Sequence, residues 1–191
     1  MSLSASIFRF STIILSLFLV SACATQVKEK PSKVTRSTVS LSEFKKVILV
    51  KSEIAKPYAG QSANIKAVNK IDEVLALRLA DVFDKVEVKT AQEVAEMDFS
   101  ATQERDVLLI KPLVKQIKFI GGAARFMVGA MAGSSVVIMD TSFEDAKSGA
   151  QLSNPGFMRK AAAYNDAFGV GSNAMLADVA QDVATYADTN K

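Results

Sequence analysis

Few side chains in this sequence are of a type that could do chemistry. There is one cysteine, Cys23, and no histidine, which excludes Ser-His-Asp and Cys-His catalysis, histidine zinc sites and histidine proton transfer. Ser42 and Lys45 have the spacing of a serine–lysine pair, but the companion motifs of that catalytic class are absent. Asp140 and Glu144 share one face of an expected strand about 13 Å apart, beyond the roughly 5–10 Å of glycosidase carboxylates. The sequence therefore predicts no enzyme, no metal and no cofactor.

Cys23 stands at the end of a short apolar run. The run from Phe10 to Val20 follows a single positive charge, Arg9, and the small residues Ser21 and Ala22 precede the cysteine. This layout is typical of a secretory signal peptide, and the run is shorter than the about 20 apolar residues that a membrane span needs. Cleavage elsewhere would leave an unpaired thiol in an oxidising compartment. The pattern favours cleavage directly before Cys23.

The motif Val20-Ser21-Ala22-Cys23 resembles the lipobox of bacterial lipoproteins. In that family the cysteine sulfur takes a lipid and the cysteine becomes the first residue of the mature chain. The resemblance implies that Cys23 carries fatty acyl chains such as palmitate. It also implies that this N-terminal lipid attaches the protein to a membrane. Ala24 follows the cysteine, where lipoproteins kept at the inner membrane commonly have an aspartate. The resemblance therefore implies a protein anchored at the outer membrane and facing the periplasm.

Composition divides the chain into three parts. We predict a lipoprotein signal peptide over 1–22, the lipidated cysteine and a flexible tether over 23–41, and a single α+β domain over 42–191. The tether is rich in Lys, Ser and Thr and has no apolar periodicity. The domain is long enough to bury a core of its own.

Apolar periodicity locates the elements of the domain. Dense aliphatic or alternating runs predict strands over 45–54, 85–89, 105–120 and 134–145, with a returning strand that starts near 150 and resumes over 157–163. Apolar residues at three- and four-residue steps predict a helix over 66–86 and a last helix capped by Ser172. We expect a mixed, mostly antiparallel sheet with two main helices packed on one face.

Local signals add detail to this outline. Thr90 and Glu93 have the spacing of a capping box, which predicts a short helix. Pro112 cannot donate to a strand ladder, so we expect a bulge or a sheet edge there. Gly149 suits the positive φ of a hairpin turn.

Residues 121–135, GGAARFMVGAMAGSS, combine four glycines with one charged residue, Arg125. Small residues allow close backbone approach, so the segment fits a tight loop and a short helix packed on the sheet. The same small-residue face could form an oligomer contact, whereas the apolar stretch is too short to span a membrane. Paired glycines beside an arginine could also form a backbone nest for an anion. The candidate interaction or anion-binding residues are Gly121, Gly122, Arg125, Gly129 and Gly133.

This segment and the strand and hairpin after it carry the specific part of a resemblance to a family of bacterial lipoproteins of unknown function. In that family a strand is followed by a glycine-bracketed arginine, a Gly-x-x-Ala-Gly-Ser stretch, a valine-rich strand and an Asp-Ala-x-x-Gly hairpin. The matching positions here are Gly122, Arg125, Gly129, Ala132, Gly133, Ser134, Val136, Asp145, Ala146 and Gly149. The resemblance covers residues 45–186 and implies no reaction.

Charge narrows the expected partners. Lys and Arg number 23 and Asp and Glu number 20, for a net charge of +3, which does not indicate a nucleic-acid-binding protein. We expect a non-enzymatic lipoprotein of the cell envelope whose domain binds an envelope protein partner or forms a homo-oligomer. The alternative is a lipoprotein that binds a small ligand or an anion through the glycine segment and Arg125.

Overall fold

The computed structural model describes residues 29–121, 133–161 and 169–191. Several sequence predictions lie outside the described residues: the signal peptide, the lipidation of Cys23, and the candidate site residues Gly122, Arg125 and Gly129. Within the described ranges, no helix is long and apolar enough to cross a membrane.

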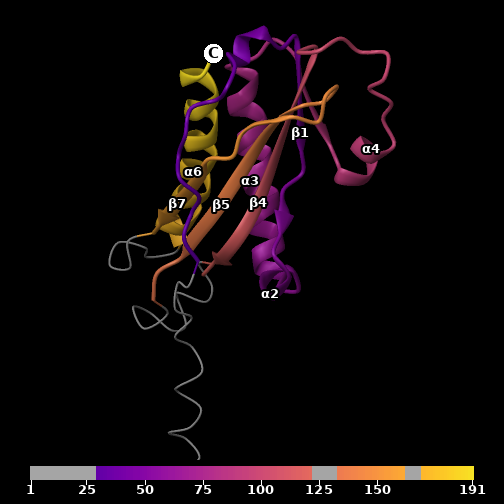
Figure 1. Cartoon of the computed structure of the whole chain (residues 1–191). Helices are drawn as coiled ribbons and strands as arrows, with labels where there is room; N and C mark the ends of the chain where they lie inside the picture. The colour runs from indigo at the N-terminus through magenta and orange to yellow at the C-terminus, as the bar shows by residue number, and fades with distance from the viewer. Residues whose placement is uncertain (1–28, 122–132, 162–168) are drawn as a thin grey trace, which may run out of the picture.

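A seven-stranded sheet forms the centre of the domain (Figure 1). Its strands are β1 (Lys46–Val50), β2 (Glu53–Ile54), β3 (Val86–Lys89), β4 (Val107–Lys118), β5 (Val136–Asp145), β6 (Gln151–Ser153) and β7 (Gly156–Lys160). They lie in the order β3-β1-β4-β5-β6, while β2 also pairs with β4 and β7 also pairs with β5.

The strand directions correct one prediction. β1 runs parallel to β3 and to β4, and β2 runs parallel to β4, whereas β5 is antiparallel to β4, β6 and β7. The sheet is therefore mixed, and the expectation of a mostly antiparallel sheet was wrong. Parallel pairing requires a long crossover between two strands, and the segments that follow β1 and β3 supply one each. Apolar alternation identifies a strand but does not reveal its direction.

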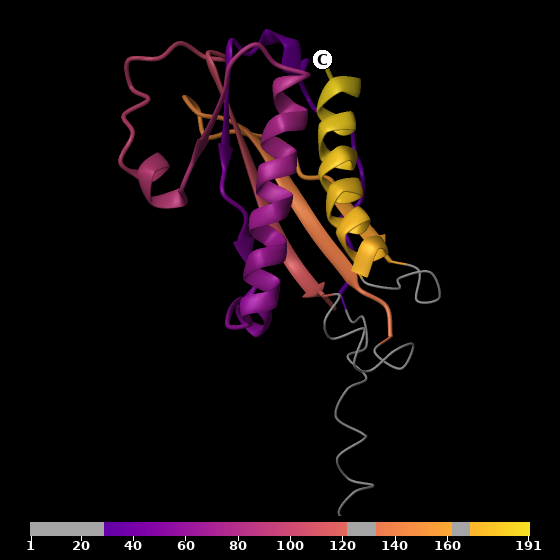
Figure 2. The same ribbon diagram turned by 180° about the vertical axis from the view of Figure 1, so that it is seen from behind.

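Two main helices, α3 (Ser62–Ala80) and α6 (Val170–Thr189), pack side by side on one face of the sheet (Figure 1 and Figure 2). This confirms the predicted α+β architecture. The described chain also has three short helices, η2 (Leu41–Glu43), α2 (Lys56–Ala59) and α4 (Ala91–Ala95). The core consists of fully buried aliphatic and aromatic side chains from the two main helices and the central strands, among them Ile71, Leu75, Leu79, Val179, Val183, Val47, Leu49, Ile110, Met139 and Phe143.

The helix ends differ from the predicted ones. α3 begins and ends earlier than the predicted range 66–86, and Val86 is the first residue of β3. α6 begins at Val170 after Gly169, which has a positive φ of 79°. The predicted cap at Ser172 was wrong, because its side chain is buried and shares a hydrogen bond of 2.7 Å with the Ser135 Oγ.

The local signals mostly hold. The capping box is present: Thr90 Oγ1 accepts from the Glu93 N–H and a Glu93 carboxylate oxygen accepts from the Thr90 N–H. Gly149 has a φ of 69°. Pro112 lies where the parallel neighbour of β4 changes from β1 to β2, so that its missing N–H breaks no ladder. The irregularity in β4 itself falls later, between Val114 and Gln116.

Residues 29–40, called the strap below, run along the domain in an extended conformation. The strap begins beside β4 on the sheet face opposite the helices, crosses β7 and ends near the C-terminus of α6 (Figure 1). Its backbone is held by side chains and carbonyls far away in sequence, namely those of Gln116, Asp140, Leu152, Tyr186 and Asn190. The described part of the predicted tether thus contacts the domain; the domain boundaries themselves stay a prediction.

A buried carboxylate from α3 supports the break between β1 and β2. Asp72 is 8% exposed and accepts hydrogen bonds from the Ser52 N–H at 3.2 Å and from the Ser52 Oγ at 2.5 Å. Desolvation by burial raises the pKa of Asp72 above its ordinary value, and the bonds from Ser52 and the charge of Lys51 only partly offset it. Ionised Asp72 is therefore less favourable in the folded protein than in the unfolded chain, which lowers the free energy of unfolding.

This cost predicts the effect of replacing Asp72. Because the folded-state pKa is raised, the folded protein binds the proton more tightly, and the free energy of unfolding falls as pH rises from the ordinary value of 3.8 through the folded-state pKa. Asp72→Asn keeps an acceptor for Ser52 and removes the charge, so we expect its stability relative to wild type to rise between about pH 4 and pH 7. Asp72→Ala leaves the Ser52 N–H without its acceptor and should cost about 1–3 kcal/mol.

Urea unfolding of the three proteins at both pH values measures these differences. If the free energy of unfolding differs between Asp72→Asn and wild type by the same amount at both pH values, the pKa of Asp72 is not raised in the folded protein.

Candidate functional site

A groove lies on the sheet face opposite α3 and α6, between α4 and the central strands. Its volume is about 420 Å³, which is within the range of ligand or side-chain pockets. The apolar lining residues are Val50, Ala91, Val94, Ala95, Pro112 and Leu113. The polar lining residues are Lys51, Glu53, Lys111, Asp140, Ser142 and Asn154. The groove therefore has an apolar floor and a charged rim.

The register of β4 and β5 explains this mixture. Lys111 lies opposite Ser142, and Leu113 lies opposite Asp140, so these four side chains share one face because side chains alternate along a strand. The other face of the same strands is in the core, where Ile110 and Met139 are fully buried. Leu113 is 40% exposed in the middle of the longest strand.

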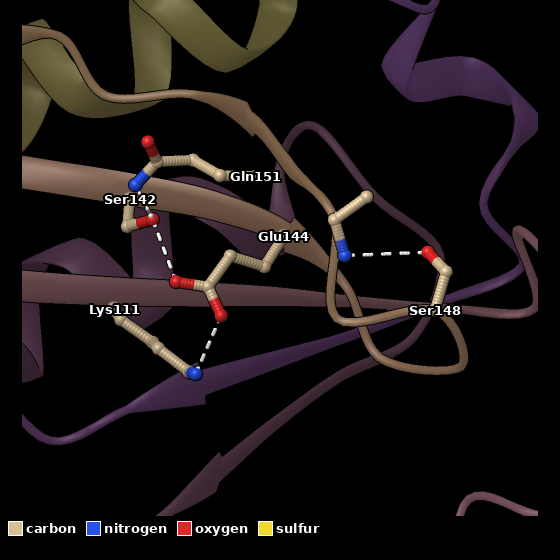
Figure 3. A network of polar contacts seen from close by, with 6 residues as sticks. Lys111, Ser142, Glu144, Ser148 and Gln151 are labelled. Atoms are coloured by element: carbon tan, nitrogen blue, oxygen red, sulfur yellow. Dashed lines mark hydrogen bonds and ion pairs between the residues drawn. The ribbon is translucent and has the colours of Figure 1, made fainter.

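A polar network crosses three strands beside the groove (Figure 3). Lys111 Nζ on β4 lies 2.6 Å from Glu144 Oε2 on β5. The other oxygen of that carboxylate accepts from Ser142 Oγ at 2.7 Å, and Gln151 Nε2 on β6 donates to the same hydroxyl at 2.8 Å. The network fixes the lysine on the groove rim and ties β6 to the central strands.

Asp140 lies two residues before Ser142 on the same face of β5, and it is held by the strap. Both of its carboxylate oxygens accept hydrogen bonds from Ser32, and Lys115 Nζ lies 3.2 Å from Oδ2. Asp140 and Glu144, which share a face as predicted, are thus each paired with a lysine. Their contacts support a structural role in joining strands and the strap.

Ser42 and Lys45 are not brought together. Ser42 Oγ shares a hydrogen bond of 2.7 Å with Ser40 Oγ, and Lys45 Nζ binds Asp106 at 2.7 Å. No group of three or more acidic or cysteine side chains in the described parts of the chain is placed to hold a metal ion. The arrangement around the groove is suited to binding an apolar side chain or an amphipathic molecule.

The glycine segment is described only at its two ends. Gly121 follows the end of β4 and Gly133, with a φ of 77°, precedes β5. A buried serine joins these ends: Ser135 Oγ accepts from the Ile120 N–H at 3.0 Å and shares a hydrogen bond with Ser172 on α6. The structure therefore places Gly121 and Gly133 at one end of the sheet, and neither lines the groove.

Sequence reasoning did not find the groove. The available signal was the alternation of Lys111, Leu113 and Lys115 on β4 with Asp140, Ser142 and Glu144 on β5. An apolar residue such as Leu113 between two lysines on the outer face of the sheet indicates that other parts of the chain partly cover this face. α4 and the strap, which flank this face, come from regions with no long apolar pattern.

The hairpin after β5 is organised by one carboxylate. Asp145 is 5% exposed and accepts from the backbone N–H groups of Arg105 at 2.8 Å, Lys147 at 2.8 Å and Ser148 at 3.0 Å. Desolvation pushes the pKa of Asp145 upward, but these hydrogen bonds outweigh it and hold the pKa below its ordinary value. Asp145 therefore joins the hairpin to the loop that precedes β4.

Comparisons with known proteins identify the fold. No protein-family model and no curated protein matches the sequence. Two structures of a PelC dodecamer from Paraburkholderia phytofirmans are similar, with TM-scores of 0.55 and 0.51 at 14% and 13% identity. The first similarity covers 83% of this chain and 98% of that chain, and the second covers 81% and 96%.

A third similar structure is protein XCC0632 from Xanthomonas campestris, described as DUF330. Its TM-score is 0.50 at 8% identity, with 84% of this chain and 94% of that chain covered. At these identities the likeness is one of fold.

Proposed function

We propose that this chain is a lipoprotein of the bacterial outer membrane, lipidated at Cys23 and facing the periplasm, whose domain is a non-enzymatic interaction module that self-associates. The lipobox supports the anchor. The observation that carries the interaction role is the open groove with Leu113 exposed at its floor. The PelC chains that share the fold are described as dodecamers, which supports a second copy as the partner.

The groove has the composition of a protein contact. An apolar centre within a charged rim is the usual anatomy of a protein–protein interface. The lining charges that are not buried have both signs, Lys51 and Lys111 against Glu53, so the groove suits a surface that also carries both signs.

Exposed apolar side chains elsewhere on the domain could fill such a groove. Leu77 on α3 is 64% exposed and Val88 on the edge strand β3 is 41% exposed. A contact between either residue of one copy and the groove of the next would be heterologous, and repeated heterologous contacts form a ring when the rotation between copies closes.

Crosslinking in cells tests this proposal. A photoreactive amino acid at Leu113 in the full-length, membrane-attached protein should give a discrete product at a multiple of the chain mass. The same amino acid at Ala174, which is exposed on α6, is the matched control and should give none. Leu113→Asp should weaken assembly by about tenfold or more in native mass spectrometry, because an unpaired carboxylate would be buried at the contact. Ala174→Asp should leave assembly unchanged.

The products separate the outcomes. A crosslink to a different envelope protein would keep the interaction role and overturn self-association. A monomer without crosslinks in native membranes would overturn both.

A further inference from the structure

The strap fixes the beginning of the described chain to one end of the sheet. The Glu29 N–H donates to Gln116 Oε1 at 3.1 Å, and Lys115 Nζ donates to the Lys30 carbonyl at 3.1 Å. Gln116 and Lys115 lie near the C-terminal end of β4, and β5 begins at the same end. The strap is therefore held at this end from Glu29 onward, before it runs along the domain.

The next residues of the strap are held more firmly. The Ser32 N–H and Oγ donate to the two carboxylate oxygens of Asp140 at 2.9 and 2.6 Å, and Asp140 is only 7% exposed. Gly156 on β7 lies so close beneath the backbone of Ser32 that an added Cβ would overlap it. Farther along, the Tyr186 hydroxyl donates to the Thr35 carbonyl at 2.6 Å.

These contacts shorten the reach of an anchor at Cys23. A tether that was free up to residue 41 could separate the lipid from the domain by about 63 Å at full extension. With the strap docked, the six residue steps between Cys23 and Glu29 span at most about 21 Å. A lipid at Cys23 therefore keeps this end of the sheet near the bilayer surface.

The same end carries lysines on the strap side of the sheet. Lys118 and Lys160 both lie opposite Val136, on β4 and β7, and therefore share a face. Lys115 precedes Lys118 by three residues on β4, and its Nζ donates to the carbonyl of Lys30 on the strap. Lys115 is paired with Asp140, while Lys160 and Lys30 are exposed. Each lysine close to an anionic lipid surface strengthens binding by about fivefold.

We propose that the docked strap orients the domain so that this end, bearing Lys30, Lys115, Lys118 and Lys160, rests on anionic lipid headgroups. The proposal rests on the lipidation of Cys23 in the proposed function. In this orientation α4 and the loop after β5 lie toward the opposite end (Figure 1), so the groove stays accessible to a partner beside the membrane.

Site-specific fluorescence quenching tests the orientation. Because Cys23 is the one cysteine in the sequence and its sulfur carries the lipid in the lipidated protein, an introduced cysteine provides the single free thiol for a dye. Asn173→Cys, in the first turns of α6, places the dye near the lysine-bearing end, and Asp84→Cys, between α3 and β3, places it at the far end. The full-length lipidated proteins are reconstituted in phosphatidylcholine vesicles containing phosphatidylglycerol and a headgroup quencher.

The expected result is strong quenching at position 173 and weak quenching at position 84. Lys118→Gln with Lys160→Gln should shift the orientation equilibrium by about thirtyfold and reduce the contrast. Lys85→Gln with Lys147→Gln removes the same charge at the far end and should leave it unchanged. Vesicles without phosphatidylglycerol should reproduce the effect of the first pair.

Three failures are distinguishable. Equal quenching at the two positions in an acylated protein would overturn the orientation and leave the proposed function standing. If intact-mass measurement shows Cys23 without acyl chains, the anchor and this orientation both fall. If the difference in quenching between positions 173 and 84 persists in the Lys118→Gln, Lys160→Gln protein, the two lysines do not hold the domain on the lipid surface.

Discussion

Asp145→Ala is expected to lower the free energy of unfolding by about 3 kcal/mol, because three backbone N–H groups that donate part-buried hydrogen bonds would lose one charged acceptor. Those donors belong to Arg105, Lys147 and Ser148. For a domain of this size the loss corresponds to a fall in Tm of roughly 6–12 °C. Calorimetry or thermal unfolding by circular dichroism measures it directly.

Asp145→Asn is the matched control for shape. It keeps one acceptor oxygen for the hairpin and loses the charge, so its destabilisation should be smaller. Because the folded-state pKa of Asp145 is lowered, its contribution to stability is complete above the ordinary value of 3.8 and is lost as pH falls through the folded-state pKa. Wild type and Asp145→Asn should therefore become more alike in strongly acidic solution. A Tm for Asp145→Ala within a degree of wild type would show that water replaces the carboxylate.

Gly156→Ala is expected to release the strap. An added Cβ would lie 2.6 Å from the Asp140 Oδ1 and closer still to the backbone nitrogen of Ser32, so either β7 or the strap must move. Overpacking of this kind costs about 1–3 kcal/mol. Hydrogen exchange at the amides of Ser32, Ser37 and Thr38, which bond to Asp140, Asn190 and Leu152, should accelerate by about thirtyfold if the strap loses 2 kcal/mol.

Gly60→Ala provides the control for this substitution. Gly60 has a helical φ of −81° and no atom within 4 Å of an added Cβ, so alanine should be tolerated there without change in exchange. Unchanged protection of the strap in Gly156→Ala would mean that the sheet moves instead. It would also predict that the orientation on vesicles is kept in that variant.

The sequence predicts most of the elements because each carries an apolar period of its own. The strands around Val47, Ile110 and Met139 and the inner face of α6 have long runs of aliphatic residues, and these runs fall in the described strands and helices. The parallel arrangement of β1, β3 and β4 escaped prediction, because an apolar run locates a strand without giving its direction, and β3 is short with exposed residues at its centre.

The candidate site was harder to predict. The groove depends on the register of β4 against β5 and on the position of α4. Both are set by tertiary contacts, which leave no local pattern in the sequence. The strap was expected to be flexible because its Ser, Thr and Lys residues resemble a linker, yet its partners Asp140, Tyr186 and Asn190 lie on later elements. The predictions for Cys23 and for an anion site at Arg125 concern residues outside the described ranges and stay predictions.

The long sequence separation of the strap contacts sets an order of events in folding. Glu29 and Gln116 are 87 residues apart, and Ser37 and Asn190 are 153 residues apart. Closing loops of this length is entropically costly, and each closure requires the later partner to be in place. The strap is the first described segment in the sequence and is therefore the last to dock, after α6 has packed. In the lipidated protein that we propose, the anchor at Cys23 therefore has its longer reach while the domain is folding and its shorter reach once the strap has docked.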